Sequence, residues 1–237
     1  MYKDNEILCI IPARGGSRGL PGKNIKNLLG KPLIAYSIEQ AKKSKYIDRI
    51  IVSTEDEQIS ETARAYDAEV PFKRPVDLAR DDSSTIDVLL HAMKWMEDTA
   101  HYRFDIVVLL HVTTPLRNPE DIDKSIELLV NEDAQNVFSV TEAYRNPYFN
   151  MVEITGENRV KLVKEGDFVT RQSAPRVFDM NSSVYVWWKD VLEEKKGLFL
   201  EKTRIYVMPR ERSIDIDGPL DFRIAEMLLG NARDHNT

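Results

Sequence analysis

The sequence has one cysteine and no long apolar run, and each absence excludes a class of protein. A single thiol forms no disulfide within the chain, and the place of Cys9 inside the apolar stretch Ile7–Ile11 favours a buried structural thiol over a nucleophile. No run reaches the roughly 20 apolar residues that span a bilayer, and the charged start does not resemble a signal peptide. We therefore expect a cytoplasmic protein with no membrane partner.

Positively charged residues are also fewer than negatively charged ones. The 237 residues include 33 Lys and Arg against 39 Asp and Glu, which gives a formal net charge of -6. This balance argues against a protein that binds a nucleic-acid backbone. An anionic ligand must then be held by a local group of cations. With 42% hydrophobic residues, the chain is an ordinary globular protein that is long enough to bury a sizeable core.

Short apolar runs alternate with helical patterns up to residue 140, which is typical of successive β-α-β units on a mostly parallel sheet. The runs are continuous rather than alternating, as expected for strands covered on both faces. The expected strands are Ile7–Ile11, Arg49–Ser53, Asp105–Leu110 and Asn136–Val140, with Glu69–Phe72 as a further short one. Signals for a helix start occur at Pro32, at Thr54 and Ser84 with an acidic residue three positions later, and at Asn118-Pro119.

After residue 140 the pattern becomes mixed. The elements expected there are two strands within Tyr148–Val163, further strands at Ser183–Trp188, Arg204–Val207 and Ser213–Asp217, and a helix at Pro219–Leu229. We predict a single domain over residues 1–237, of the doubly wound α/β class. It has a mostly parallel, Rossmann-like sheet and a small mixed insert lobe at about 141–200.

Four of the ten glycines lie between residues 15 and 22, directly after the first expected strand. In a doubly wound sheet, ligands bind beyond the carboxyl ends of the strands, where glycines let backbone N–H groups approach phosphate oxygens. The same segment carries the cations Arg14, Arg18 and Lys23. It matches neither a Walker loop nor the pattern G-x-G-x-x-G. We interpret it as a phosphate-binding loop of another kind, with a flexible surface loop as the alternative.

A second candidate is the pair Asp215 and Asp217, which alternates with Ile214 and Ile216. If this segment is a strand, both carboxylates lie on one side and both isoleucines face the core. Neighbouring carboxylates repel each other, and Mg2+, which binds one or two carboxylates together with substrate phosphates and water, relieves that repulsion. We therefore predict a site for Mg2+ or another divalent cation at Asp215 and Asp217, both near solvent. A solvated acidic turn is the alternative.

Six motifs form a set along nearly the whole chain. They are Ile11–Asn24, Lys73-Arg74-Pro75, Thr113-Thr114-Pro115-Leu116-Arg117, Arg171-Gln172, Asn181 with Tyr185, and Asp215-Ile216-Asp217. Together they resemble the CMP-sialic acid synthetases, or acylneuraminate cytidylyltransferases. The resemblance implies an enzyme that joins CTP to the anomeric hydroxyl of an acidic nine-carbon sugar, a nonulosonic 2-keto-3-deoxy acid, and releases pyrophosphate. It also implies the family's Rossmann-like nucleotidyltransferase fold and a homodimer that forms through the insert lobe, with the lobe extending toward the partner's active site.

The resemblance also assigns roles to single residues. For the nucleotide it implies Ala13, Arg14, Gly15, Ser17, Lys23, Asn24, Arg74 and Thr85, and for the sugar acid it implies His111, Arg171, Asn181 and Tyr185. The expected catalytic residues are Arg14, Lys23, Asp215 and Asp217. Loop cations and Mg2+ stabilise the charge that develops in phosphoryl-type transfer, and an arginine engages both oxygens of a sugar carboxylate.

The acceptor half departs from the family pattern at three places. His111 replaces a glutamine, Ser182 replaces a glycine, and aromatic residues near Asn146 replace a lysine. These changes favour a legionaminate-type acid over N-acetylneuraminate. A CMP-KDO synthetase, which uses an eight-carbon acid, is the alternative enzyme. A non-catalytic nucleotide-binding regulator is the alternative from another class.

Overall fold

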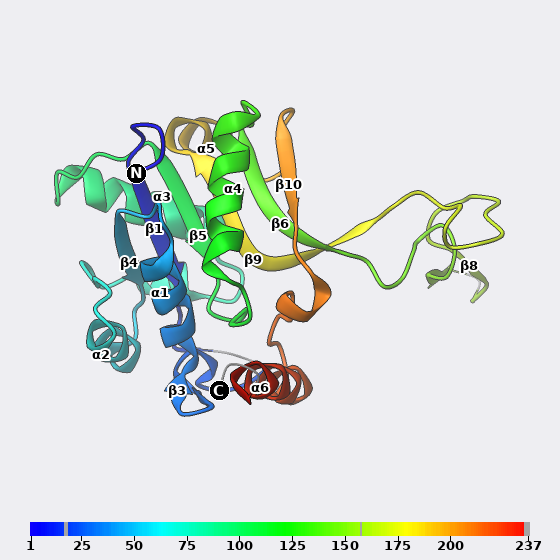
Figure 1. Ribbon diagram of the computed structural model, residues 1–237, viewed down its shortest axis with the longest axis horizontal. Coiled ribbons are helices and arrows are strands. Elements are labelled where there is room, and N and C mark those ends of the chain that lie inside the picture. The colour runs from blue at the N-terminus through cyan, green and yellow to red at the C-terminus, as the bar shows by residue number, and fades with distance from the viewer. Residues whose placement is uncertain (17–18, 157, 235–237) are drawn as a thin grey trace.

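A central sheet of six strands forms the body of the protein in this computed structural model (Figure 1), which describes residues 1–16, 19–156 and 158–234, the side chains of 232–234 excepted. The strands are β1 (Ile7–Pro12), β4 (Arg49–Ser53), β5 (Ile106–Leu110), β6 (Asn136–Glu142), β9 (Phe178–Trp188) and β10 (Thr203–Val207). Their order is β10-β6-β9-β5-β1-β4. Only β9 runs against its neighbours in this sheet, so the predicted mostly parallel α/β sheet is confirmed.

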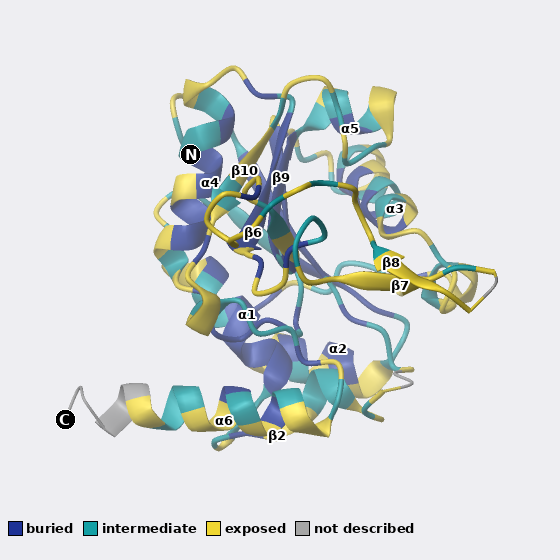
Figure 2. Ribbon diagram, turned by 90° about the vertical axis from the view of Figure 1, so that its right-hand side faces the viewer, coloured by how far each residue is buried: buried dark blue, intermediate teal, exposed yellow. Residues whose placement is uncertain are grey.

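Helices cover both faces of the sheet. They are α1 (Leu33–Lys43), α2 (Glu57–Ala65), α3 (Thr85–Asp98), α4 (Pro119–Asn131), α5 (Lys189–Lys195) and α6 (Pro219–Asp234). Apolar residues of α1, α2, α4 and α6 pack on one face, and those of α3 and α5 pack on the other. The inner strands β1, β5 and β6 are therefore buried on both sides, whereas the edge strand β10 is half-buried or exposed along its length (Figure 2). Cys9 in β1 is fully buried, and burial raises the pKa of its thiol to about 12, as expected for a structural residue.

Helix starts follow the expected signals with one exception. Ser84 caps α3 by accepting a hydrogen bond from the N–H of Ile86, and Pro119 is the first residue of α4. The predicted start at Thr54 is wrong, because the N-cap of α2 is Asp56, whose Oδ1 accepts from the N–H of Ile59 at 3.0 Å. The carboxylate of Asp56 reaches the free N–H groups of the first turn.

Two expected strands are absent from the described residues. Around Glu69–Phe72 the chain makes only isolated bridges to the edge strand β4 and to Thr54. Ser213–Asp217 follows the 3-10 turn η3 (Arg210–Arg212) and is joined to its neighbour by one backbone bond, from Ile216 N–H to the carbonyl of Thr113. The first segment thus pairs with β4 at single positions only, and the second has no neighbouring strand among the described residues with which to form a hydrogen-bond ladder.

The remaining short elements lie outside the main sheet. They are β2 (Asn27–Leu28), β3 (Lys31–Pro32), β7 (Val152–Ile154), β8 (Val160–Leu162) and the 3-10 turns η1 (Lys23–Ile25) and η2 (Val76–Ala79). β7 and β8 form the hairpin predicted within Tyr148–Val163. No helix of the described residues combines the length and the apolar character needed to cross a membrane.

The segment between β6 and β9 projects from the body as an arm that carries the β7-β8 hairpin (Figure 1). This projecting arm contains fewer residues than the insert expected at about 141–200, because it ends where β9 begins. The reason is that β9 is inserted as a central strand between β5 and β6, and α5 then covers the sheet. The mixed character read from the sequence is thus partly that of the main sheet itself.

Candidate active site

A cavity of about 280 Å³ lies beyond the carboxyl ends of β1 and β5. Six residues that the sequence singled out line it, namely Arg14, Lys23, Asn24, Arg74, Thr85 and His111. Parallel strands present their following loops at one edge of the sheet, so residues far apart in the chain meet there. Ser17, also expected here, lies outside the described residues, as does Arg18.

The glycine-rich loop after β1 is fixed at both of its ends. The side-chain amide of Asn24 donates to the carbonyl of Arg14 at 2.8 Å, which closes the loop. Lys23 Nζ donates to the carbonyl of Ile216 at 2.6 Å and lies 3.4 Å from the carboxylate of Asp217. A Cβ at Gly19 would overlap the carbonyl oxygen of Asp217. The loop and the Asp215–Asp217 segment, two separate motifs in the sequence, therefore pack against each other.

Two residues of the expected nucleotide set face the protein instead of the cavity. Ala13 is 1% exposed, and its N–H donates to the carbonyl of Ser53 at 3.0 Å. The N–H of Gly15 donates to Glu55 Oε1 at 2.7 Å, so it is not aimed at a phosphate. Of the loop glycines, Gly16 lines the cavity.

Two carboxylates that were not predicted from the sequence form ion pairs with two arginines that line the cavity. Glu55 pairs with Arg74, and Asp81, in the loop before α3, pairs with Arg14 at 2.8 Å. The position of Glu55 just after β4 was a usable signal, because ligands bind beyond the carboxyl ends of parallel strands. Nothing in the sequence marked Asp81 among its acidic neighbours.

Asp215 and Asp217 differ in their surroundings, against the expectation that they share one exposed strand face. The Asp217 side chain is 83% exposed, whereas Asp215 is half-buried and its Oδ1 has no hydrogen-bond partner among the described residues. Burial raises the pKa of Asp215 and the charge of Asp217 raises it further, while Thr113, Ser182 and Lys23 act in the opposite direction. Ile216 is fully buried, as expected.

This pair fits a divalent cation. A buried, unpartnered carboxylate oxygen is a ready ligand, and a bound cation would remove the cost of leaving that oxygen unsatisfied. Within the described part of the chain, no group of three or more His, Cys, Asp or Glu is arranged so that it could hold a metal ion. The site would thus supply one or two carboxylates and leave the other positions to phosphates and water, which is the coordination Mg2+ favours.

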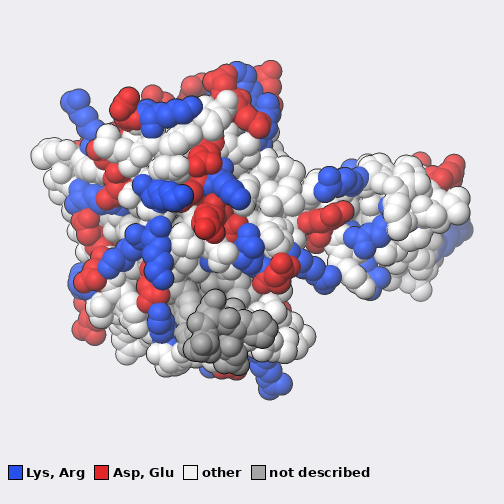
Figure 3. All heavy atoms as spheres, in the orientation of Figure 1, with Lys and Arg blue, Asp and Glu red and all other residues white. Residues whose placement is uncertain are grey.

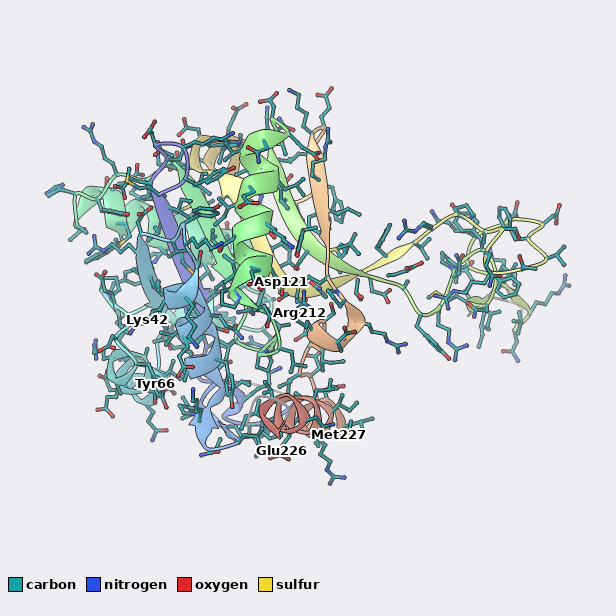
Figure 4. All side chains as sticks on the ribbon, viewed as in Figure 1. Lys42, Tyr66, Asp121, Arg212, Glu226 and Met227 are labelled. Carbon is teal, nitrogen blue, oxygen red and sulfur yellow. The ribbon has the colours of Figure 1, made fainter. Side chains whose placement is uncertain are left out.

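Contacts with Asp121 of α4 hold the segment that contains Asp215 in place. Arg212, just before it, makes a two-point contact with Asp121 of α4, at 2.8 Å and 3.0 Å (Figure 4). Asp121 is fully buried, and it also accepts from the hydroxyl of Tyr206 at 3.1 Å. A bidentate pair of this kind fixes direction as well as distance. The segment is therefore held in place without being a strand.

His111 stands at the end of β5, where two cavities meet. The second cavity, of about 180 Å³, shares Thr85 and His111 with the first. Its other lining residues are Ile86, Leu89, Leu109, Tyr185, Trp187 and Leu198. Burial, together with Arg117 and Lys23, lowers the pKa of His111 to about 4, so the imidazole is neutral at physiological pH. It can therefore donate one hydrogen bond and accept another.

The structure does not bring the four expected sugar residues together within one chain. Tyr185 contacts His111 edge to face, with ring centroids 5.7 Å apart. Asn181 is 3% exposed and uses its amide inside the protein, where it accepts from Ser139 at 2.7 Å and donates to Ser213 at 2.9 Å. Arg171 lies at the base of the arm, where it donates to the carbonyl of Ala143 at 2.6 Å.

Asn181 has a structural role in the described chain. Its side chain is saturated by the network that links β6, β9 and Ser213, and it does not line either cavity at His111. It holds the residue that leads into the Asp215 segment. Of the expected sugar residues, His111 lines both cavities and Tyr185 lines the second.

Comparison with known proteins identifies the family. Residues 8–227 match the family model described as cytidylyltransferase, and the chain belongs to this family. It is 43% identical to the CMP-N,N'-diacetyllegionaminic acid synthase of Campylobacter jejuni, over 94% of this chain and 95% of that one. It is 40% identical to the post-translational flagellin modification protein B of Campylobacter coli, over 95% of each chain. The chain is thus a nucleotidyltransferase, as the sequence motifs predicted.

Solved structures confirm the fold. A CMP:2-keto-3-deoxy-manno-octonic acid synthetase complexed with CTP superimposes with a TM-score of 0.72, over 96% of this chain and 99% of that one, at 17% identity. A 4-diphosphocytidyl-2C-methyl-D-erythritol synthase from Anaerococcus prevotii gives a TM-score of 0.66 at 14% identity, over 95% and 96% of the two chains. At these identities the likeness concerns the fold alone.

Proposed function

We propose that this cytidylyltransferase joins CTP to a nonulosonic acid of the N,N'-diacetyllegionaminate type. The identity to relatives named for that acid, 43% and 34%, is higher than the 32% identity to an N-acylneuraminate cytidylyltransferase of Streptococcus agalactiae. The observation that carries the proposal is the mostly apolar cavity that opens beside the nucleotide cavity at His111. A doubly N-acetylated acid offers methyl groups that such a surface can cover.

The reaction follows from the placement of charges. The anomeric oxygen attacks the α-phosphorus of CTP, the bond to pyrophosphate breaks, and the hydroxyl proton is released. Arg14 and Lys23 line the cavity and neutralise the triphosphate, and Asp215 with Asp217 would hold Mg2+ there. When bound, the cation stabilises the charge on the leaving pyrophosphate. Because Lys23 is bonded to the Ile216 carbonyl, the loop cation and the carboxylates keep a fixed relation.

A pyrophosphate-release assay tests this function directly. CTP with N,N'-diacetyllegionaminate should give the highest kcat/KM in a panel that also holds N-acetylneuraminate, pseudaminate and KDO. UTP and ATP should give little turnover. Equal turnover with UTP would refute the assignment of the nucleotide, and preference for KDO would favour the alternative enzyme. No turnover with any acid, despite CTP binding, would favour the regulator.

His111→Gln should change which acid is preferred while CTP binding stays nearly intact. His111 joins the nucleotide cavity to the apolar cavity with Tyr185, so its side chain faces the acceptor side. We expect the kcat/KM ratio between the legionaminate-type acid and N-acetylneuraminate to shift by about tenfold. Since the pKa of His111 is about 4, the wild-type kcat/KM for the acid should show no imidazole titration near pH 6.5. A changed KM for CTP with an unchanged acid preference would contradict this role.

A homodimer that forms through the arm is also part of the proposal. In the β7-β8 hairpin, Val152 pairs with Leu162 and Ile154 pairs with Val160, so these four share one face. Val152, Ile154 and Val160 are 61%, 70% and 65% exposed. The opposite face carries the ion pair of Glu153 and Lys161, and Figure 3 shows wide uncharged areas on the arm. A second copy of the chain would cover this apolar face and place Arg171 within reach of its partner's cavity.

Ile154→Asp should convert the dimer into a monomer, because it places a charge on the apolar face of the hairpin. Sedimentation velocity measures the change, and Lys161→Gln on the opposite face is the matched control that stays dimeric. Mixing inactive Asp215→Asn protomers with inactive Arg171→Ala protomers should restore part of the activity, since one site of each mixed dimer is then intact. A wild-type monomer, or no recovery on mixing, would refute the shared site.

A further inference from the structure

Glu55 joins two parts of the nucleotide cavity that come from different strands. It lies two residues after β4, and its carboxylate bridges the loop after β1 and the segment after Glu69–Phe72. Oε1 accepts from the N–H of Gly15 at 2.7 Å. Oε2 accepts from Arg74, from Nη2 at 2.5 Å and from Nε at 3.1 Å. Each carboxylate oxygen thus holds one side of the cavity.

Arg74 and Glu55 form a largely buried ion pair, so removing the Glu55 carboxylate is costly. The side chains of Arg74 and Glu55 are 4% and 17% exposed. The Glu55 carboxylate stabilises the charge of this buried guanidinium, and the two bonds to Glu55 fix the plane of the Arg74 fork. The third nitrogen, Nη1, takes no part in that contact, and Arg74 lines the cavity. Because its charge is balanced by Glu55, Arg74 contributes orientation more than net positive charge.

The hydrogen bond between Glu55 and Gly15 also constrains the glycine-rich loop after β1. Gly15 precedes Gly16, which lines the cavity, and a Cβ at Gly15 would press on the Asp56 carboxylate at 2.5 Å. The Gly15 backbone therefore lies directly against the turn that carries Glu55. A shift of that carboxylate would move Gly15 and the Arg74 guanidinium together.

We propose that Glu55 is a positioning residue that couples the two sides of the CTP site, by holding the Arg74 guanidinium and the Gly15 backbone in one arrangement. Glu55 does not itself touch CTP. The proposal rests on the assignment of this cavity to CTP. Lys23→Ala tests that assignment separately, because Lys23 lines the cavity and has no contact with Glu55. If Lys23→Ala leaves CTP binding unchanged, the assignment of the cavity is what fails.

The first test is Glu55→Gln, with CTP affinity measured by calorimetry in the absence of the acid. The amide keeps one acceptor oxygen but turns an N–H group toward either Gly15 or Arg74 and removes the counter-charge. We expect the Kd for CTP to rise tenfold or more while the KM for the acid stays within twofold. Glu57→Gln is the matched control, because Glu57 is an exposed residue of α2 whose pairing with Arg64 is a loose 3.6 Å contact. It should bind CTP as the wild type does.

The second test separates positioning from simple stabilisation by a double-mutant cycle with Arg74→Met. If Glu55 acts through Arg74, adding Glu55→Gln to Arg74→Met should raise the Kd for CTP by about threefold or less. The Tm should fall in Glu55→Gln, which leaves a buried charge unpaired, and recover in the double variant. Independent effects of the two substitutions on Kd would overturn the proposal. A lower Tm with unchanged CTP affinity, or equal weakening of CTP and acid, would overturn it as well.

Discussion

Replacing Asp215 or Asp217 with asparagine should lower kcat by about a hundredfold, which corresponds to roughly 3 kcal/mol of transition-state stabilisation. Both carboxylates lie beside the loop cation Lys23, and the Oδ1 of Asp215 has no hydrogen-bond partner among the described residues. Removing one carboxylate removes a ligand of the divalent cation where the pyrophosphate gains negative charge. The measurement is kcat over a Mg2+ titration. Near wild-type turnover with unchanged Mg2+ dependence in both variants would exclude the pair from the reaction.

The two variants should differ in stability, since their environments differ. Burial raises the pKa of Asp215 above its value in the unfolded chain, so the folded state binds more protons between those two pKa values. The free energy of unfolding then falls as the pH rises through that window. Asp215→Asn removes this loss, and its apo Tm should exceed that of the wild type at pH 7 but not below about pH 3, where the carboxyl is protonated in both states.

Asp217→Asn provides the contrast. The Asp217 side chain is 83% exposed, so its apo Tm should stay close to the wild-type value at both pH values. Activity and stability thus move independently in the two variants. A lower Tm for Asp215→Asn at pH 7 would show that the hydrogen bonds of the carboxylate with Thr113 and Ser182 outweigh the cost of its burial.

The parts of the site that follow strands were predictable from the sequence. Continuous apolar runs locate β1 and β5, and the carboxyl ends of parallel strands must meet at one edge. That rule brings Lys23 and His111 to one cavity. This rule depends on the order and direction of the strands and not on side-chain contacts. It could therefore place Lys23 and His111 together although they are far apart in the sequence.

The details that failed depend on contacts between distant segments. Ser213–Asp217 alternates like a strand, yet it has no neighbouring strand among the described residues, and Arg212 and Asn181 hold it instead. The burial of Asn181 and its bonds with the side chains of Ser139, Met208 and Ser213 are likewise not visible in sequence spacing. Glu55 escaped notice because its role requires Arg74 and Gly15 to meet, which no local pattern encodes. The antiparallel insertion of β9 between β5 and β6 also depends on contacts between distant segments that no local pattern encodes.

Arg117 is the other residue for which we expect a large effect. Its side chain is 2% exposed and lies below the loop that follows β5. Nε donates to Ser183 at 3.0 Å, and Nη1 donates to Ser37 at 3.0 Å and to Gln40 at 3.2 Å. No carboxylate among the described residues hydrogen-bonds it. Burial lowers the pKa of Arg117 to about 10, so the guanidinium stays charged at neutral pH.

The remaining bonds of Arg117 reach the site itself. Nη2 donates to the carbonyl of His111 and to the hydroxyl of Thr114. The guanidinium therefore fixes the backbone of His111 from below, and its charge helps to keep that imidazole neutral. No other side chain offers donors in this planar, forked arrangement. Arg117→Lys keeps the charge but replaces the fork by one nitrogen, which cannot reach all of these acceptors.

Both Arg117→Lys and Arg117→Met should lower the free energy of unfolding by about 3 kcal/mol, because each leaves buried acceptors without donors. Urea unfolding measures this. Arg204→Met is the control, since Arg204 is 43% exposed in a surface pair with Glu132, and such pairs are worth about 1 kcal/mol or less.

The two variants should separate in the titration of His111, followed by NMR. Burial, the larger cause of the lowered pKa, is nearly unchanged in both, whereas the nearby positive charge is lost only in Arg117→Met. The pKa of His111 should therefore rise above about 4 in Arg117→Met, but stay below the ordinary value of about 6.5, and change little in Arg117→Lys. Equal His111 pKa values in both variants would show that the guanidinium acts on His111 through packing alone. Wild-type stability in Arg117→Lys would show that a buried charge, and not the forked set of bonds, is what this position requires.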